Sequence, residues 1–337
     1  MPESSSRPFW CVSVNPAIDK RVRVSALLPG CVNRVKNVQA EPGGKSAHVA
    51  MVLRTLGADP LWLGFVGGNT GELLLRGLHE SHIRSHPLVV SADTRVNLEI
   101  IDDCGVVTEL LEPGSTIAQE SWDDFFSMCK EMFSLEKTSG TVIASGSLPP
   151  GADPGFYANL ATLSHNYGHK IILDTGGEPM RLALSTNPDF IKPNREEAES
   201  LIGEKIGDCK AAKNATDRLI ELGARSAAVT LGNQGFLWQP GAGQDAYLAH
   251  AISVPVKSSV GCGDSTVAAF AYAMSAGFGV EETLRLAAAC GAANCLANAP
   301  GRASDTDIRA LQALVRVDKL KPQSRKGFTD GSGAKMN

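Results

Sequence analysis

The chain has 337 residues, of which 43% are hydrophobic and 20% are charged, a composition typical of a globular protein of one large or two smaller domains. Its formal net charge of −4, with no long basic run, argues against nucleic acid or an anionic membrane as the main partner. The eight cysteines form no Cys-x-x-Cys pair, no apolar run is long enough to cross a membrane, and residues 1–8 lack a leader segment, so we expect a cytoplasmic protein with reduced thiols.

The first 112 residues combine buried and half-exposed strands. Apolar runs predict buried strands at 9–14 and 61–66, and periodic apolar residues predict helices at 46–56 and 72–79. Half-exposed strands are predicted at 20–24, 32–38, 95–101 and 106–111. The run Asp102-Asp103-Cys104-Gly105 is expected to join the last two as a hairpin turn.

From residue 121 onward, helices and strands alternate. Helices are predicted at 122–133, 154–166, 195–202 and 209–222, and strands at 141–144, 170–174, 190–192 and 227–231. Three further helices are predicted at 264–276, 280–299 and 305–315. Such alternation indicates a parallel sheet that is covered on both faces by helices. Residues 321–337 have no apolar pattern and are expected to be a disordered tail.

We therefore predict a doubly wound α/β body with a small β lid. The body comprises residues 1–15, 41–93 and 113–320, and the lid is discontinuous, formed by residues 16–40 and 94–112. Ligands of such sheets bind beyond the carboxyl ends of the strands, where most of the polar motifs of this chain fall.

The stretch from Val260 to Ser265 is the strongest local signal. Gly261 and Gly263 allow a sharp turn that exposes consecutive N–H groups at the start of a helix. That helix, 264–276, is apolar on every side, which is typical of a buried helix. A carboxylate, Asp264, next to an anion-binding turn suits phosphoryl transfer. An Asp that caps a core helix is an equally weighted alternative.

Two familiar phosphate-binding motifs fail on spacing. Gly44-Lys45-Ser46 lacks the earlier glycine of a P-loop, because residue 39 is Gln. A dinucleotide fingerprint ending at Gly71 fails because residue 66 is Val. Gly43-Gly44 instead predicts a turn that brings the backbone close to a ligand, with Lys45 at a helix N-terminus. A solvated lysine is the alternative.

Other polar residues also admit two interpretations. Asp19 follows the first strand, and either binds sugar hydroxyls or caps a turn. Arg95 and Asn97 share one face of a strand and suit phosphate and hydroxyl groups, or simply form its exposed face. Asn194 and Glu197 lie one helical turn apart, and either hold Mg²⁺ through water or cap a helix. The seven histidines have no paired metal-binding spacing, so we do not expect a catalytic metal site built from histidine.

The order of the motifs is more specific than any one of them. They are, in sequence, Asn15-Pro16-Ala17-Ile18-Asp19, Gly43-Gly44-Lys45, Thr94-Arg95-Val96-Asn97, Ser145-Gly146-Ser147-Leu148-Pro149-Pro150-Gly151, Lys192-Pro193-Asn194-Arg195-Glu196-Glu197, Thr230-Leu231-Gly232 and Gly261-Cys262-Gly263-Asp264. Over roughly residues 9–316 this arrangement resembles the PfkB (ribokinase-like) carbohydrate kinase family. The likeness is greatest to its hexose-phosphate branch, which includes 1-phosphofructokinase and tagatose-6-phosphate kinase.

The resemblance implies an ATP- and Mg²⁺-dependent kinase that phosphorylates fructose 1-phosphate, tagatose 6-phosphate or fructose 6-phosphate, with a β lid that often forms a homodimer. It implies that Asp264 is the general base and that the amides of Gly261, Cys262 and Gly263 form an anion hole. The implied sugar-phosphate residues are Asp19, Gly43, Gly44, Lys45, His48, Arg95, Asn97 and Gly146. The implied nucleotide residues are Lys192, Asn194, Glu197, Thr230, Gly232, Gly235 and Asn294, and Glu197 would hold Mg²⁺ through water or phosphate.

Three positions depart from the family pattern. Cys262 replaces Ala, which leaves the amide donor in place, and Ser46 and His48 replace Gly and Asn. We expect His48 to line the sugar pocket and to alter the choice of sugar, because one imidazole nitrogen cannot both donate and accept as an amide does from its two ends. The cations Lys45 and Arg95, with Arg34 as a third candidate, favour an acceptor that already carries a phosphate.

The second hypothesis assigns the protein to a different functional class. The same fold could serve as a catalytically silent regulator that binds a sugar phosphate. Intact Asp264, preceded by Gly261 and Gly263, favours the enzyme.

Overall fold

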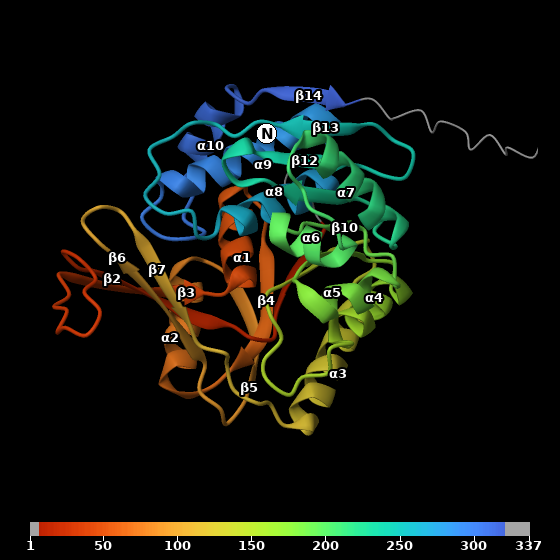
Figure 1. The fold of residues 1–337 in the computed structure, drawn as a ribbon. Coiled ribbons are helices and arrows are strands. Elements are labelled where there is room, and N and C mark those ends of the chain that lie inside the picture. Colours follow the sequence, from red (N-terminus) through yellow and green to blue (C-terminus); the bar gives the residue numbers. More distant parts are fainter. Residues whose placement is uncertain (1–6, 321–337) are drawn as a thin grey trace, which may run out of the picture.

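A mostly parallel sheet of ten strands forms the centre of the computed structural model, which describes residues 7–320 (Figure 1). The strand order is β14-β13-β12-β11-β10-β9-β8-β1-β4-β5. The parallel strands are β1 (Phe9–Ser13), β4 (Pro60–Val66), β5 (Arg84–Val89), β8 (Thr141–Ser145), β9 (Lys170–Asp174), β10 (Phe190–Ile191) and β11 (Ala227–Thr230). The antiparallel edge consists of β12 (Phe236–Gln239), β13 (Ala246–Ala249) and β14 (Val317–Leu320).

Helices cover both faces of this sheet, as the alternation of elements predicts. One face carries α1 (Lys45–Thr55), α2 (Gly68–Glu80), α8 (Cys262–Ala276), α9 (Val280–Leu296) and α10 (Asp305–Gln312). The other carries α3 (Gln119–Leu135), α4 (Phe156–Asn166), α5 (Gly177–Leu184), α6 (Arg195–Ile202) and α7 (Cys209–Glu221). A 3-10 turn, η1 (Gly232–Gln234), joins β11 to β12.

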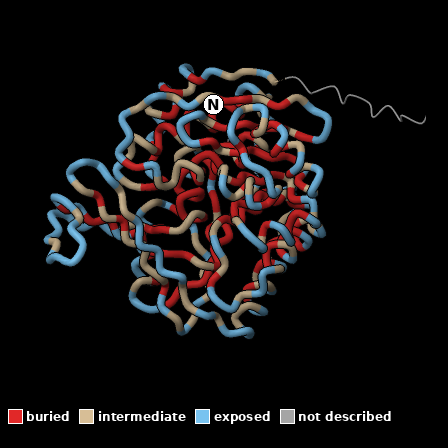
Figure 2. The backbone as a smooth tube through the Cα atoms, viewed as in Figure 1, coloured by how far each residue is buried: buried red, intermediate tan, exposed pale blue. Residues whose placement is uncertain are grey.

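Side chains along β1 show how the sheet separates two apolar cores. Phe9 and Cys11 enter the core beneath α1 and α8, whereas Trp10 and Val12 enter the core beneath α3 and α4. This alternation follows from the two-residue period of a strand. Burial is therefore continuous through the middle of the body (Figure 2).

Four strands form a second sheet, which we call the flap. Its order is β3-β2-β6-β7, with β2 (Ala17–Arg23), β3 (Asn37–Gly43), β6 (Arg95–Ile101) and β7 (Val107–Leu111). The predicted hairpin turn is confirmed, because the amide of Val106 donates to Oδ1 of Asp102 (2.9 Å) and the amide of Gly105 donates to the Asp102 carbonyl (3.0 Å). The flap projects from the body (Figure 1).

The two faces of the flap differ in polarity. Asp19 lies opposite Asn97, and Arg21 lies opposite Glu99, so these four residues share one face. Arg21 and Glu99 form a buried salt bridge of 2.7 Å. The opposite face carries apolar residues, among them Leu110 of β7.

Several sequence predictions need correction. The strand predicted at 32–38 is wrong over most of its length, because β3 begins at Asn37 and continues to Gly43, past the lid boundary that we placed at residue 40. Arg34 therefore lies in the exposed loop before β3. The helix predicted from Asp264 begins at Cys262, and the helices predicted to end at 299 and 315 end at Leu296 and Gln312.

β5, α5 and the antiparallel strands β12, β13 and β14 were not predicted from the sequence. The predicted tail 321–337 and most of the predicted polar N-terminus lie outside the described residues. None of the described helices combines the length and the apolar character that a bilayer crossing demands.

Candidate active site

Asp264 is positioned by α8, a helix most of whose residues are buried in the body. Gly261, the N-cap of α8, has φ of 80°, a conformation that glycine adopts without strain. Further along α8, the ring of Phe270 stacks on Phe190 with centroids 4.4 Å apart, which fixes the helix against β10. Asp264 itself is 6% exposed. Asp264 is thus a buried carboxylate in the first turn of a helix that is packed into the core.

His48, on α1, lies between the carboxylates of Asp19 and Asp264. Its Nδ1 forms a hydrogen bond of 2.7 Å with Oδ2 of Asp264. Its Nε2 is 2.9 Å from Oδ2 of Asp19, but without the alignment of a hydrogen bond. Burial lowers the pKa of His48, but the contacts and charges of the two carboxylates outweigh burial and raise it to about 10. His48 is therefore an imidazolium at neutral pH.

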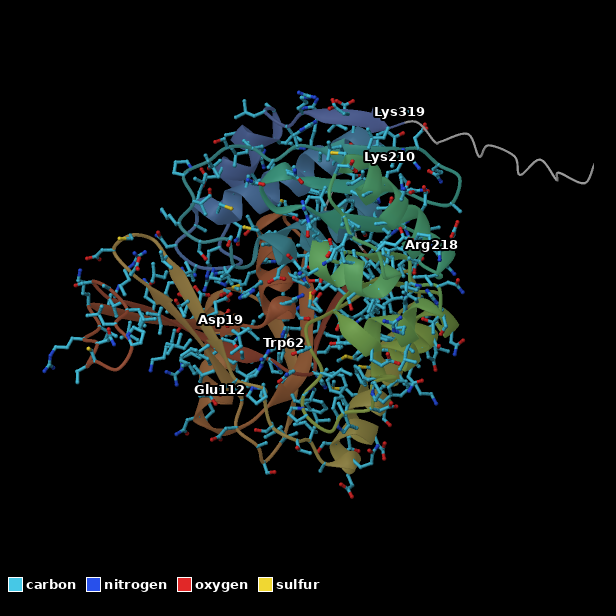
Figure 3. The ribbon with its side chains drawn as sticks, viewed as in Figure 1. Asp19, Trp62, Glu112, Lys210, Arg218 and Lys319 are labelled. Carbon is cyan, nitrogen blue, oxygen red and sulfur yellow. The ribbon has the colours of Figure 1, made fainter. Side chains whose placement is uncertain are left out.

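Asp19 connects the flap to this histidine, at the place where the flap joins the body (Figure 3). Asn97 Nδ2 donates to Oδ1 of Asp19 at 2.9 Å. Burial raises the pKa of Asp19, but the contacts with His48 and Asn97 lower it below its ordinary value. A Cβ at Gly43 would lie 2.3 Å from Oδ1 of Asp19, so only glycine leaves room for this carboxylate.

Lys45 and Lys192 approach one buried acid, Asp174, at the end of β9. Lys45 Nζ is 3.2 Å from Oδ2 and Lys192 Nζ is 3.2 Å from Oδ1, as ion pairs without hydrogen-bond alignment. Burial raises the pKa of Asp174, but the charges of Lys192 and Lys45 outweigh burial and lower the pKa below its ordinary value. A Cβ added at Gly263 would lie 3.2 Å from Lys192 Nζ, so this ammonium group adjoins the first turn of α8.

The turn before α8 is held by Asn294 of α9. Asn294 Nδ2 donates to the Val260 carbonyl at 2.7 Å, and its Oδ1 accepts from the Gly301 amide at 2.9 Å. The amide of Cys262 donates to the Ser259 carbonyl at 3.3 Å. Among the predicted anion-hole donors, the Cys262 amide is thus already hydrogen-bonded within the turn. The side chain of Asn294 holds the turn in place through its two hydrogen bonds.

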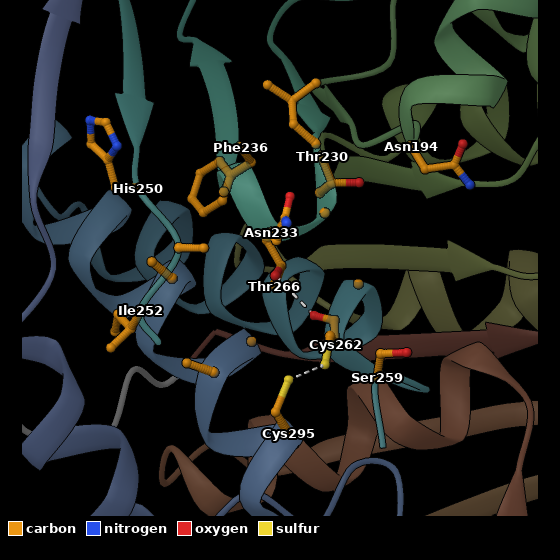
Figure 4. A pocket seen from close by; sticks show the side chains of 18 of the residues that line it. Asn194, Thr230, Asn233, Phe236, His250, Ile252, Ser259, Cys262, Thr266 and Cys295 are labelled. Atoms are coloured by element: carbon orange, nitrogen blue, oxygen red, sulfur yellow. Dashed lines mark hydrogen bonds between the residues drawn. The ribbon is translucent and has the colours of Figure 1, made fainter. Parts of the chain in front are cut away.

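A cavity of about 780 Å³ lies beside this turn, between α8, α9 and the strands β11 and β12 (Figure 4). Its lining includes four of the predicted nucleotide residues, Asn194, Thr230, Gly232 and Gly235. Cys262, Gly263 and Cys295 also line it. The predicted residues Lys192, Glu197 and Asn294 are not part of its described lining.

Asn194 and Glu197 form a capping box at the start of α6. Asn194 Oδ1 accepts from the Glu197 amide, and Glu197 Oε2 accepts from the Asn194 amide, each at 2.8 Å. The capping interpretation is therefore confirmed. One Glu197 oxygen, Oε1, has no part in the box and would be 3.4 Å from a Cβ placed on Gly176.

Mg²⁺ is compatible with this arrangement. Residues 7–320 contain no group of three His, Cys, Asp or Glu side chains that could hold a metal ion. Mg²⁺ in kinases is typically bound by one or two carboxylates, with water and substrate phosphates completing its shell. Glu197 offers one such carboxylate oxygen near the cavity.

Arg95 lies at the base of the flap. Its Nε donates to the Asn15 carbonyl at 3.2 Å and its Nη1 to the Glu112 carbonyl at 2.7 Å. Burial lowers its pKa, and the charges of Asp19 and Glu112 oppose that shift. Arg95 therefore braces two loops as well as adding positive charge near Asp19.

The remaining predicted residues have clear backbone roles. Gly146 has φ of 117°, and its carbonyl accepts from the Tyr157 hydroxyl at 3.0 Å. Gly44 has φ of 83° and is the N-cap of α1. Ser46, which replaces the glycine of the family pattern, donates to the carbonyls of Val12 and Ser145 and so ties α1 to the ends of β1 and β8.

Sequence reasoning missed Asp174. The available signal was an Asp at the carboxyl end of an apolar strand, which is the edge where ligands of such sheets bind. Its contacts with Lys45 and Lys192 join residues far apart in the chain, so no local spacing reveals them.

Comparisons with known proteins show which proteins this chain resembles. A model of the pfkB family carbohydrate kinases matches residues 11–307. The chain is 31% identical over 317 residues to a 1-phosphofructokinase of Escherichia coli strain K12, which covers 94% of this chain and 99% of that protein. It is 28% identical over 312 residues to a 1-phosphofructokinase of Borreliella burgdorferi, covering 93% and 99%. Phosphofructokinase-2 of Escherichia coli, solved in complex with substrates and products, has a TM-score of 0.84 at 25% identity and covers 91% of this chain and 99% of that one.

Proposed function

Because this chain belongs to the pfkB family of carbohydrate kinases, we propose that it transfers the γ-phosphate of ATP to a hydroxyl of a ketohexose monophosphate. The acceptors to test first are fructose 1-phosphate, fructose 6-phosphate and tagatose 6-phosphate. The relatives named 1-phosphofructokinase support the first of these.

The observation that carries the proposal is the position of Asp264. On one side of it the 780 Å³ cavity reaches Cys262 and Gly263, in the first turn of the same helix. On the other side, His48 links it to Asp19 of the flap. A phosphoryl donor in the cavity and an acceptor hydroxyl near Asp19 would therefore meet at this carboxylate.

In the proposed reaction, Asp264 accepts the proton of the attacking hydroxyl. A helix N-terminus and the His48 imidazolium both stabilise the carboxylate, which makes Asp264 a weak base. A loose phosphoryl-transfer transition state requires little proton removal until late, so a weak base suffices. The amide of Gly263, in the first turn of α8, and the ammonium group of Lys192 would stabilise charge on the transferred phosphoryl group. Mg²⁺, when bound through Glu197, would neutralise the nucleotide phosphates.

We further propose that Arg95 and Lys45 favour an acceptor that carries a phosphate. Replacing Arg95 with Ala should cost about 1.5–3 kcal/mol, the range for charged hydrogen bonds, which is roughly 10–150-fold in kcat/KM. The loss should fall on phosphorylated sugars and spare any weak turnover of free hexose. Steady-state kinetics on both kinds of sugar test this.

Arg95→Lys is the matched control, because it keeps the charge and loses the planar fork that also braces the Asn15 and Glu112 carbonyls. It should fall between wild type and Arg95→Ala. An Arg95→Ala variant that loses activity on both sugars equally, or on neither, refutes the phosphate-binding role.

A catalytically silent sugar-phosphate sensor is the second candidate, and the hydrogen bond from His48 to Asp264 favours it, because the base is already engaged. A coupled assay of ADP release across the three sugar phosphates and free hexoses separates the two. Calorimetric binding of a sugar phosphate without ADP release would select the sensor. ADP release with any of the phosphates selects the kinase.

A further inference from the structure

Two thiols lie in contact in the wall of the 780 Å³ cavity. Cys262 Sγ, in the first turn of α8, is 3.1 Å from Cys295 Sγ, in the last turn of α9, and one thiol donates a hydrogen bond to the other (Figure 4). Both side chains are partly exposed and line the cavity. The Asn294 amide contacts Cys262 Sγ at 3.5 Å, which restrains its position.

The other cysteines lack this arrangement. Burial raises the pKa of the Cys11, Cys129 and Cys290 thiols, which disfavours the reactive thiolate. The hydrogen bond with Cys262 lowers the pKa of Cys295 to about 7, and the same contact raises the pKa of Cys262. When one of the two thiols loses its proton, the other thiol donates a hydrogen bond to it, and the directions of the two shifts favour Cys295 as the thiolate.

We propose that Cys262 and Cys295 form a reversible oxidation site, at which a hydroperoxide converts the two thiols into a disulfide that lowers kinase activity. The residues are held on neighbouring helices, within bonding reach of each other and open to a small oxidant through the cavity. The effect on activity rests on the proposed kinase function, but the disulfide itself does not.

The chemistry needs only the peroxide. The Cys295 thiolate attacks one peroxide oxygen, the O–O bond breaks, and hydroxide leaves, giving a sulfenic acid at Cys295. The Cys262 thiol then displaces water from that sulfur as the S–S bond forms. Overall, two thiols and one hydrogen peroxide give one disulfide and two waters, and a dithiol reductant reverses the bond.

The bond would disturb the site through Cys262, the residue after the Gly261 turn. A disulfide holds its sulfurs about 2.05 Å apart, whereas these are 3.1 Å apart, so the sulfurs must approach by about 1 Å. A displacement of about 1 Å near reacting groups can cost roughly 10²-fold in rate. We therefore expect oxidation to reduce kcat/KM by at least about 10-fold.

The test treats the full-length protein with hydrogen peroxide, blocks the remaining thiols with N-ethylmaleimide, and maps the peptides by mass spectrometry. The expected product is a cross-linked peptide pair joining Cys262 and Cys295 that has lost two hydrogen atoms. Dithiothreitol should remove the cross-link and restore ADP release. ADP should slow cross-linking, since both sulfurs line the cavity. Separate alkylation of the two thiols after oxidation overturns the proposal. A cross-link that ADP does not slow counts against nucleotide binding in this cavity and leaves the disulfide standing.

Matched variants assign the effect to this pair. Cys31 and Cys104 are exposed, so the Cys31→Ser/Cys104→Ser double variant controls for disulfides between molecules and should still lose activity on oxidation. After treatment with hydrogen peroxide, Cys295→Ser should retain the activity that the same variant has before treatment. Equal losses in Cys295→Ser and wild type overturn the regulatory claim. A cross-link in a protein that releases no ADP leaves the oxidation site standing and refutes only the kinase function.

Discussion

The side chain of His48 contacts two carboxylates, Asp19 and Asp264, which would have separate roles in a sugar kinase. Asp264 belongs to the body and Asp19 to the flap, and the imidazolium lies within 3 Å of both. The neighbouring cluster repeats the principle with signs reversed, since Asp174 lies between Lys45 and Lys192. Each buried charge thereby faces opposite charges, so removal of one partner would leave an uncompensated buried charge, which is strongly destabilising.

Asp264→Asn should lower kcat by about 10²–10⁴-fold, the range for loss of a general base. Nucleotide affinity should persist, because the amide keeps the shape of the side chain at the edge of the cavity. Stopped assays and calorimetry with ADP measure the two quantities. Asp208→Asn is the control, because Asp208 also lies at the start of a helix, α7, where its Oδ1 accepts from the Ala211 amide, and should leave kcat unchanged. Wild-type turnover in Asp264→Asn removes Asp264 from the mechanism.

The charge of His48 should make stability depend on pH. Its pKa rises from 6.5 in the unfolded chain to about 10 in the folded one, so its contribution is fully present below pH 6.5 and is lost as pH rises through about 10. Urea unfolding of wild type and His48→Asn across this window tests this. The wild-type free energy of unfolding should fall more steeply with pH, and parallel profiles would show that the two acids do not hold the proton.

At the scale of elements, the sequence predicts those whose apolar period is strong and misses those that depend on context. β5 contains Pro87, which argues against a strand, but β5 is at the edge of the sheet, where a missing N–H is tolerated. α5 starts with Gly177 and Pro179, a weak helix signal. β12, β13 and β14 are four residues each, too short for a period to be distinguished, and β14 pairs with β13 across a long connection.

The residues of the site divide in the same way. Asp264, the glycines before it and the strand face that Arg95 shares with Asn97 follow from local patterns. The bridge from His48 to both acids does not, because it joins α1, α8 and β2 across 216 positions in its longest contact. Similarly, the capping box of Asn194 and Glu197 could be read from spacing alone, whereas Asp174 could not.

Glycines at the two ends of α8 allow a direct test of its turn. A Cβ at Gly261, with φ of 80°, would meet Pro300 Cβ at 2.8 Å, whereas Gly277, with φ of 74°, has open space around it. Gly277→Ala should cost about 1–2 kcal/mol for the left-handed backbone alone. Gly261→Ala should cost more and should also lower kcat. Urea unfolding and ADP release measure both, and equal stability losses would contradict the crowding argument.

In the whole molecule, the two faces of the flap differ in polarity. Asp19 and Asn97 occupy the face that meets His48, while the opposite face exposes Val38 (48% exposed) and Leu110 (56% exposed). An apolar sheet face of this kind is typical of a surface that associates with another chain. We therefore expect two copies of the protein to pair through this face.

Light scattering should give twice the monomer mass, and Leu110→Arg should give the monomer mass, because a charge would be buried between the flaps. Leu314→Arg is the matched control, since Leu314 is equally apolar and 67% exposed on the body. It should remain a dimer. A wild-type protein that is monomeric at all concentrations, with and without ligands, removes the dimer.

The discontinuity of the flap has a consequence for the order of folding. Its central strands β2 and β6 pair residues 78 positions apart, such as Asp19 and Asn97. Closing a loop of that length costs roughly 4 kcal/mol beyond a constant, from the logarithmic dependence on loop length. α1, β4, α2 and β5 belong to the body and lie within the loop, and their packing with the ten-stranded sheet brings the ends of the loop together. The flap strands therefore pair after that part of the body has folded. Recovery of enzymatic activity then reports the completion of folding, whereas recovery of helical structure and burial of apolar side chains report only the formation of the core.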